Sequence, residues 1–259
     1  MKYPTILFLF FTTIFITAFK EDPVPNVYKV IKVDGSIIYQ KTGKSMTTGD
    51  QFSESEKLVF KTEESRAAVI SSLKGRFILS AQNNGLSNNL LPAMNNVKTR
   101  AGALLSLIDL QNYFKGDFLV VDERKQTIAE ASFPMNETNF FYVQYVYNGE
   151  EIHKKLPYDG NELIISKAEL FTIDGKAVTS QDKISLKLWY RNAEEKKSLL
   201  VSEFICIMPA KVEIMKELAV IIKEHQKGEE KKLIEEAAGF LNDFYGSADT
   251  DYVKQLLKK

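Results

Sequence analysis

The chain has 259 residues, enough for one large or two ordinary domains, and its 44% hydrophobic and 26% charged residues are a normal globular mixture. Lys plus Arg equals Asp plus Glu at 34 each, so the net charge does not favour nucleic acid, whose binding proteins are usually basic or carry a basic stripe. Cys206 is the only cysteine, which excludes an intrachain disulfide, and its apolar neighbours in EFICIMP predict a buried, inert thiol.

The N-terminal segment predicts export. Lys2 is followed by an uncharged apolar run from Pro4 to Phe19. A helix of this length spans roughly 24 Å, short of the ~30 Å hydrocarbon core. A signal peptide covering residues 1–18 therefore fits better than a spanning helix, and we expect a periplasmic or cell-envelope protein. The alternative is an uncleaved membrane anchor, because Ala18 with Ile16 two positions earlier makes an imperfect cleavage site.

Residues 27–81 are expected to form a small β-module. Short segments with strand-like alternation follow one another, namely YKVIKV, SIIYQK, KLVFKT, RAAVISSL and RFILSA. Asp34-Gly35 between the first two segments is typical of a hairpin, and Lys74-Gly75 predicts a turn between the last two.

The middle of the chain predicts a connection followed by a second β-module. Residues 82–116 include an Asn-rich loop, and their apolar run from Leu104 to Phe114 fits a short helix or a strand. Residues 117–208 repeat strand and turn signals at intervals typical of an antiparallel β-sandwich. Asn148-Gly149 and Asp174-Gly175 both suit tight turns between strands. On the clearest strand, one face is expected to carry Phe141, Val143, Tyr145 and Tyr147.

The C-terminal region, residues 209–259, predicts helices. After Pro209, apolar residues recur at helical spacing in stretches that begin near Ile214 and Leu233. Asp249 or Thr250 is the candidate N-cap of a last short helix. The expected fold class is therefore mainly β with a C-terminal α-helical segment: a small β-module, then an antiparallel β-sandwich-like module, then a helical tail.

Gly43-Lys44-Ser45 raises the question of nucleotide binding. Ile38 stands where the first glycine of a phosphate-binding loop is required. The following MTTGDQFSESE contains turn residues where a helix should begin. We therefore expect no bound nucleotide and place Lys44 in solvent.

Other chemical motifs are equally sparse. The sequence has neither a Gly-x-Ser-x-Gly nor a His-Glu-x-x-His motif. His153 and His225 are far apart in the sequence and do not suggest a metal site. Asp122 and Glu123 end a predicted strand, but no base or oxyanion donor is paired with them. We predict no catalytic, cofactor-binding or metal-binding residues, and no cofactor.

Two aromatic features are candidates for binding. Tyr142 and Tyr145 are candidate ligand-stacking residues, or they simply occupy the two faces of a central strand. Trp189 is expected to share a strand face with Lys187 and Arg191, opposite the apolar face. Either the C-terminal helices cover this tryptophan, which is the expectation we favour, or these three residues mark a partner-binding surface.

Residues 28–81 resemble the periplasmic β-domain of FecR-type proteins. The family pattern combines a glycine-ended strand, a Gly-Asp turn, a Thr and Ser-Arg-Ala segment and a final glycine turn. The family usually has a leucine three positions before the Gly-Asp turn, and Met46 replaces it here. The matching positions are Val33, Gly35, Gly49, Asp50, Thr62, Ser65, Arg66, Ala67 and Gly75.

The resemblance implies a bacterial, envelope-located recognition module. Regulatory members of the family contact a sigma factor through a segment ahead of their membrane helix. Only Met1 to Tyr3 precede the apolar run here, so that role is not carried over.

We expect a non-enzymatic protein-binding or scaffolding role in the cell envelope, within a secretion or signalling assembly. The expected partner is another envelope protein, with no nucleic acid, no nucleotide, and contact with the membrane only if the N-terminal segment is uncleaved. The alternative is a carbohydrate- or peptidoglycan-binding protein. A third possibility is an enzyme with an unfamiliar carboxylate site.

Overall fold

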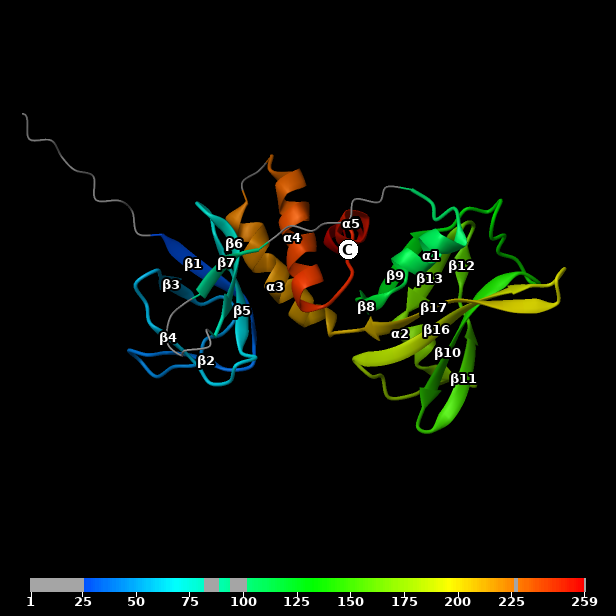
Figure 1. Ribbon diagram of the computed structural model, residues 1–259, viewed down its shortest axis with the longest axis horizontal. Helices are drawn as coiled ribbons and strands as arrows, with labels where there is room; N and C mark the ends of the chain where they lie inside the picture. The colour runs from blue at the N-terminus through cyan, green and yellow to red at the C-terminus, as the bar shows by residue number, and fades with distance from the viewer. Residues whose placement is uncertain (1–25, 82–88, 94–101, 226–227, 259) are drawn as a thin grey trace, which may run out of the picture.

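The computed structural model describes residues 26–81, 89–93, 102–225 and 228–258, so the expected signal peptide lies outside the described residues. Two β-bodies flank a layer of helices (Figure 1). The fold is mainly β with a C-terminal helical segment and several antiparallel sheets, which confirms the expected fold class. None of the helices in the described ranges is long and apolar enough to cross a membrane.

The first body is a five-stranded sheet with the order β3-β1-β5-β6-β7. Its strands are β1 (Val27–Asp34), β3 (Gln51–Ser53), β5 (Arg66–Ser71), β6 (Gly75–Ser80) and β7 (Asn89–Pro92). A separate ladder pairs β2 (Ile37–Tyr39) with β4 (Leu58–Phe60). One face of the sheet packs on this ladder through the buried residues Tyr28, Val30, Ile37, Met46, Phe52, Leu58, Ala67, Val69 and Leu79.

The Asp34-Gly35 turn does not close the expected hairpin. β1 pairs with β3 and β5, whereas β2 pairs with β4. Gly35 has a φ of +77°, and a Cβ there would lie 2.7 Å from Ser65 Oγ. The dipeptide therefore predicted a turn correctly, and this turn passes close to Ser65. The strand that follows it, β2, pairs with β4 and not with β1.

Residues that carry the FecR resemblance hold this turn in place. Ser65 Oγ accepts hydrogen bonds from the backbone N–H groups of Ser36 and Thr62. Arg66 pairs with Asp34 at 3.1 Å. These contacts are structural, and the family relationship itself stays a prediction.

The second body packs a large sheet against a small one. The large sheet has the order β11-β10-β16-β17-β8 and the small one β12-β13-β9. All pairings in both sheets are antiparallel except that of β17 with β8. The strands of the large sheet are β8 (Gly116–Leu119), β10 (Phe140–Tyr147), β11 (Glu150–Lys155), β16 (Lys183–Asn192) and β17 (Lys197–Ile207). The small sheet contains β9 (Glu123–Thr127), β12 (Tyr158–Asp159) and β13 (Glu162–Ser166).

Shorter elements complete this body. They are α1 (Leu107–Tyr113), α2 (Lys167–Leu170) and the hairpin of β14 (Thr172–Ile173) with β15 (Lys176–Ala177). Residues 104–114, for which the sequence allowed either a helix or a strand, contain the helix α1. Ser106 Oγ caps this helix by accepting a hydrogen bond from the backbone N–H of Asp109. Positive φ values at Asn148 (50°) and Gly149 (86°) confirm that tight turn.

The C-terminal helices α3 (Lys211–Glu224), α4 (Glu230–Phe244) and α5 (Thr250–Lys258) lie between the two bodies (Figure 1). Asp249 Oδ1 accepts from the backbone N–H of Tyr252 at 2.8 Å, which confirms the expected cap of the last helix. The core of the helical layer also contains Ile31, Ala68 and Ile70 of the first sheet, Leu119 at the end of β8, and Val121 just after that strand. The helices therefore join the two bodies by apolar packing.

Ion pairs attach the helices to the first sheet. Arg76 on β6 is buried and reaches Glu236 at 3.3 Å and Asp243 at 2.5 Å, both on α4. Lys32 reaches Glu217 on α3 at 3.3 Å. Burial raises the pKa of Glu217, although the hydrogen bond from Tyr245 and the charge of Lys32 oppose that rise.

A second buried arginine attaches the helices to the second body. The guanidinium of Arg124 on β9 donates to Asp249 at 2.9 Å and to the Tyr113 hydroxyl at 2.8 Å. It also donates to the backbone carbonyls of Leu119 and Ser247, at 3.0 and 2.6 Å. The charge thus has a carboxylate partner and its N–H groups have acceptors.

Replacing Arg124 with Met should lower the free energy of unfolding by about 3–5 kcal/mol, because Asp249 then stays buried without its partner. The measurement is urea denaturation at neutral pH. The matched control is Arg66→Met at a half-exposed ion pair, where we expect a loss of about 1 kcal/mol or less. Equal losses in the two variants would contradict the structural role assigned to Arg124.

Cys206 should not react with a thiol reagent in the folded protein. Burial raises the pKa of its thiol to about 12, so almost no thiolate is present at about pH 8. We expect no labelling by Ellman's reagent in buffer and one thiol per chain after unfolding. Rapid labelling of the folded protein would show that β17 opens or that Cys206 is exposed.

Candidate functional site

The candidate partner-binding residues lie together on one face of the large sheet. We call this the outer face, because it points away from the small sheet. Along β16, Leu186, Leu188 and Tyr190 are buried in the sandwich core. The alternating positions Lys187, Trp189 and Arg191 therefore lie on the outer face, as the period-two pattern predicted.

Aromatic rings cross three neighbouring strands of the outer face. Tyr142 on β10 is directly opposite Trp189 in the ladder, and their rings are stacked with centroids 6.2 Å apart. The His153 ring on β11 lies 6.0 Å from Tyr142 on its other side. Trp189 Nε1 donates to Gln144 Oε1 at 3.0 Å, which holds the indole in place. The result is an ordered, partly exposed aromatic row.

Tyr145 does not belong to this surface. Only 3% of the residue is exposed, and its hydroxyl donates to the backbone carbonyl of Leu170. Its ring lies in the sandwich core with Phe141 and Val143. It is therefore unavailable for stacking a ligand, and only Tyr142 of the two candidate tyrosines reaches the outer face.

The C-terminal helices do not cover Trp189, contrary to the expectation that we favoured. They pack near Ile207 at the far end of β17. Away from that end, the outer face carries the exposed apolar residues Val146 (62%) and Leu200 (36%). Leu200 lies directly opposite Trp189 in the ladder of β16 and β17. The apolar part of this face therefore has no covering layer among the described residues.

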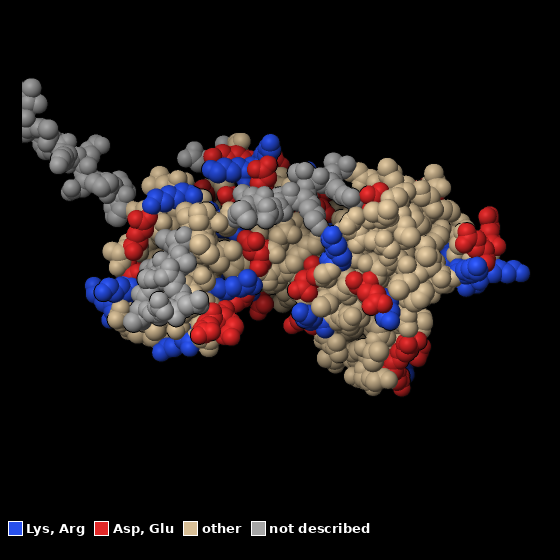
Figure 2. All heavy atoms as spheres, viewed as in Figure 1, with Lys and Arg blue, Asp and Glu red and all other residues tan. Residues whose placement is uncertain are grey.

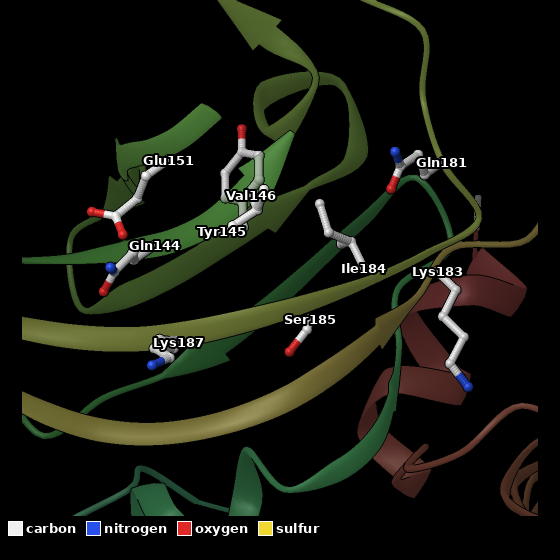
Figure 3. Close-up of a pocket in the computed structure, with 9 residues that line it drawn as sticks. All are labelled: Gln144, Tyr145, Val146, Glu151, Gln181, Lys183, Ile184, Ser185 and Lys187. Atoms are coloured by element: carbon white, nitrogen blue, oxygen red, sulfur yellow. The ribbon is translucent and has the colours of Figure 1, made fainter. Parts of the chain in front are cut away.

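A depression adjoins the aromatic row. The β10–β16 ladder ends at the pair Gln144 and Lys187, although both strands continue beyond it. The strands diverge there and open a shallow space of about 370 Å³. Figure 3 shows Gln144 and Glu151 side by side on neighbouring strands, with Lys187 and Ser185 on β16. Hydrogen bonds from His153 and then Gln144 lower the pKa of Glu151, so its carboxylate stays charged.

The charged residues on the outer face carry both signs. Across the five strands of the sheet the cations are Lys155, Lys183, Lys187 and Arg191, and the anions are Asp117, Glu151 and Glu203. Lys183 lies 3.8 Å from Asp117. Lys187 reaches Glu203 at 3.5 Å, and Lys155 reaches the exposed Glu137 at 3.5 Å. Arg191, opposite Phe140, forms no ion pair within the described part of the chain. In the view of Figure 2, charges of both signs are likewise interspersed over the molecule.

Asp122 and Glu123 line a separate open pocket of about 560 Å³ with Ser166 and Lys167. Asp122 has a φ of +59°, and its carbonyl accepts from the backbone N–H of Lys167 at 2.7 Å. Its carboxylate lies 3.5 Å from Lys211. These contacts are those of a turn residue between β8 and β9. Within the described ranges, no group of three or more His, Cys, Asp or Glu side chains could hold a metal ion.

Gly43-Lys44-Ser45 lies in a tight turn. The backbone N–H of Gly43 donates to the Tyr39 carbonyl, and the N–H of Tyr39 donates to the Lys44 carbonyl. No helix follows, and Asp50 instead accepts from the backbone N–H of Thr47 at 2.8 Å. The local structure differs from the strand, loop and helix of a phosphate-binding loop.

Several contributors to the outer face were not identified from the sequence. Gln144 and Val146 follow Tyr142 at every second position of the same strand, so they lie on the same face. The alternation in the sequence was therefore sufficient to identify them. His153 reaches the aromatic row because β11 pairs with β10, and Leu200 reaches it because β17 pairs with β16. No local sequence pattern specifies either pairing.

Replacing Lys44 with Ala should change the free energy of unfolding by about 0.5 kcal/mol or less, because the side chain is exposed on a turn. Urea denaturation measures this change. Binding of a labelled ATP analogue should be undetectable in both proteins. Binding by the natural chain that Lys44→Ala abolishes would reopen the phosphate question.

A scan against protein-family models finds no match for this chain, and a search of curated proteins finds none either.

Proposed function

We propose that the chain is an exported bacterial envelope protein with a non-enzymatic role, which binds another envelope protein through the outer face of the large sheet. The observation that supports this proposal most directly is the partly exposed Trp189, stacked with Tyr142 and flanked by Arg191 and Lys187. Tryptophan, tyrosine and arginine are the residues most enriched among those that dominate binding at protein interfaces.

The arrangement of the rings favours a protein over a glycan. Tyr142 lies between Trp189 and His153, so neighbouring rings occupy the space on both sides of it. Val146 and Leu200 add exposed aliphatic area that a sugar ring does not require. A partner protein can bury these aliphatic groups together with the edges of the rings.

The rigidity of the sheet also suits a binding surface. The Trp189 side chain is fixed by its hydrogen bond to Gln144 and by the facing Tyr142 ring. A side chain that is already ordered loses little conformational entropy on binding.

Trp189→Ala should reduce recovery of a crosslinked envelope partner about tenfold or more, because it removes the central aromatic anchor. The measurement is co-purification from the native host after mild crosslinking, with quantitative mass spectrometry. The matched control is Leu73→Ala, which removes a still more exposed apolar side chain (73% exposed) from the first body.

The crosslinking results distinguish the outer face from the alternative binding modes. Loss of the same proteins in Trp189→Ala, but not in Leu73→Ala, supports the outer face as the binding surface. Unchanged recovery in Trp189→Ala contradicts it. Binding to purified peptidoglycan that Tyr142→Ala abolishes would favour the glycan alternative instead.

A further inference from the structure

The strand β11 forms an open edge of the large sheet. It stands last in the sheet order and lies along the lower margin of the second body in Figure 1. Leu156, just after the strand, donates its backbone N–H to the Phe141 carbonyl at 2.9 Å. Hydrogen-bonded pairs alternate along an antiparallel ladder, so the even-numbered residues of β11 bond to β10. Glu151, His153 and Lys155 therefore turn their backbone N–H and C=O groups outward.

The outward groups of these three residues have no backbone partner within the described ranges. Their side chains lie on the outer face and are exposed. Glu151 accepts from His153 at 2.7 Å, and Lys155 reaches only the exposed Glu137, at 3.5 Å. A strand with free N–H and C=O groups along one side is a template for pairing with a strand of another chain.

The order of charges along β11 selects the partner. The strand reads EEIHKK, with carboxylates in its first half and ammonium groups in its second half. Charged side chains on an edge strand generally discourage pairing with other chains. A second copy that runs antiparallel is different, because the two-fold axis brings the acidic half of one strand opposite the basic half of the other. A parallel copy in register would instead place like charges opposite each other, which is destabilising.

The backbone geometry selects one register of this antiparallel pair. The outward-facing residues of one strand must lie opposite those of the other. With the two-fold axis at His153, Glu151 lies opposite Lys155 of the second copy, and Lys155 lies opposite Glu151 of that copy. All three outward-facing residues then form backbone hydrogen bonds. Moving the axis by one residue in either direction pairs one of them with a residue outside β11.

We propose that the β11 strands of two copies pair antiparallel about His153 and join their large sheets into one continuous sheet. The contact between Glu151 and Lys155 occurs twice in this dimer. The two outer faces lie on the same side of the joined sheet, and the two aromatic rows meet at the axis. This dimer does not depend on the proposed envelope partner, and it leaves both outer faces uncovered.

Sedimentation of the purified protein between about 10 µM and about 1 mM measures the association, because a single pair of strands is a small interface that binds weakly. We expect a monomer–dimer equilibrium. Glu151→Lys should weaken dimerisation at least about tenfold, since two lysines then lie opposite each other at both contacts. Lys155→Glu should weaken it similarly by opposing two carboxylates. The matched control is Lys197→Glu, an exposed charge at the start of β17, which should leave dimerisation unchanged.

Mixing the two weakened variants gives the sharpest test. When Glu151→Lys pairs with Lys155→Glu, a lysine lies opposite a glutamate at both contacts. The mixture should therefore form a heterodimer with about the affinity of the natural homodimer, although each variant alone is largely monomeric. A structural defect in either variant would not be repaired by mixing.

The remaining outcomes contradict the inference. A natural chain that stays monomeric at about 1 mM overturns the dimer. A dimer that persists in both single variants shows that another surface holds the copies together. Loss of the dimer in both variants without recovery in the mixture overturns the antiparallel register. In all these cases the crosslinking of Trp189→Ala tests the proposed function separately.

Discussion

The buried guanidinium of Arg124 is the contact on which the arrangement of this molecule depends. Only 1% of its side chain is exposed, so the charge must be neutralised inside the protein. Asp249 supplies the opposite charge with one oxygen and caps α5 with the other. The same guanidinium holds the backbone carbonyl of Ser247, in the turn between α4 and α5. Arg124 thereby fixes the helical layer to the second body, as Arg76 fixes it to the first.

The exposure of the outer face follows from where the helices are held. Among the described residues, they cover the free face of the first sheet and meet the large sheet at β8 and near Ile207. The aromatic row around Trp189 lies further along β16 and β17, beyond that contact. The chain thus uses its helices to unite the two bodies and leaves a partly apolar sheet face open to a partner. This division of roles connects the core of the molecule to its proposed function.

The sequence predicted the local features of the fold well, because neighbouring residues determine them. Positive φ at Asn148 and Gly149, the cap at Asp249 and the inward position of Tyr145 all follow from short patterns. The pairing of β2 and the exposure of Trp189 do not. Arg124 and Asp249 are 125 positions apart, so no local pattern shows where they hold the helices. For the same reason, Trp189, Lys187 and Arg191 were grouped correctly on one strand, whereas His153 joins them only through strand register.

Acrylamide quenching of the single tryptophan tests the central claim most directly. If the helices leave the outer face open, Trp189 is accessible to the quencher in the free, folded protein. Binding of the captured partner should then shield it. Emission that resists acrylamide in the free protein, as a buried indole does, would show that the outer face is already covered and would contradict the account.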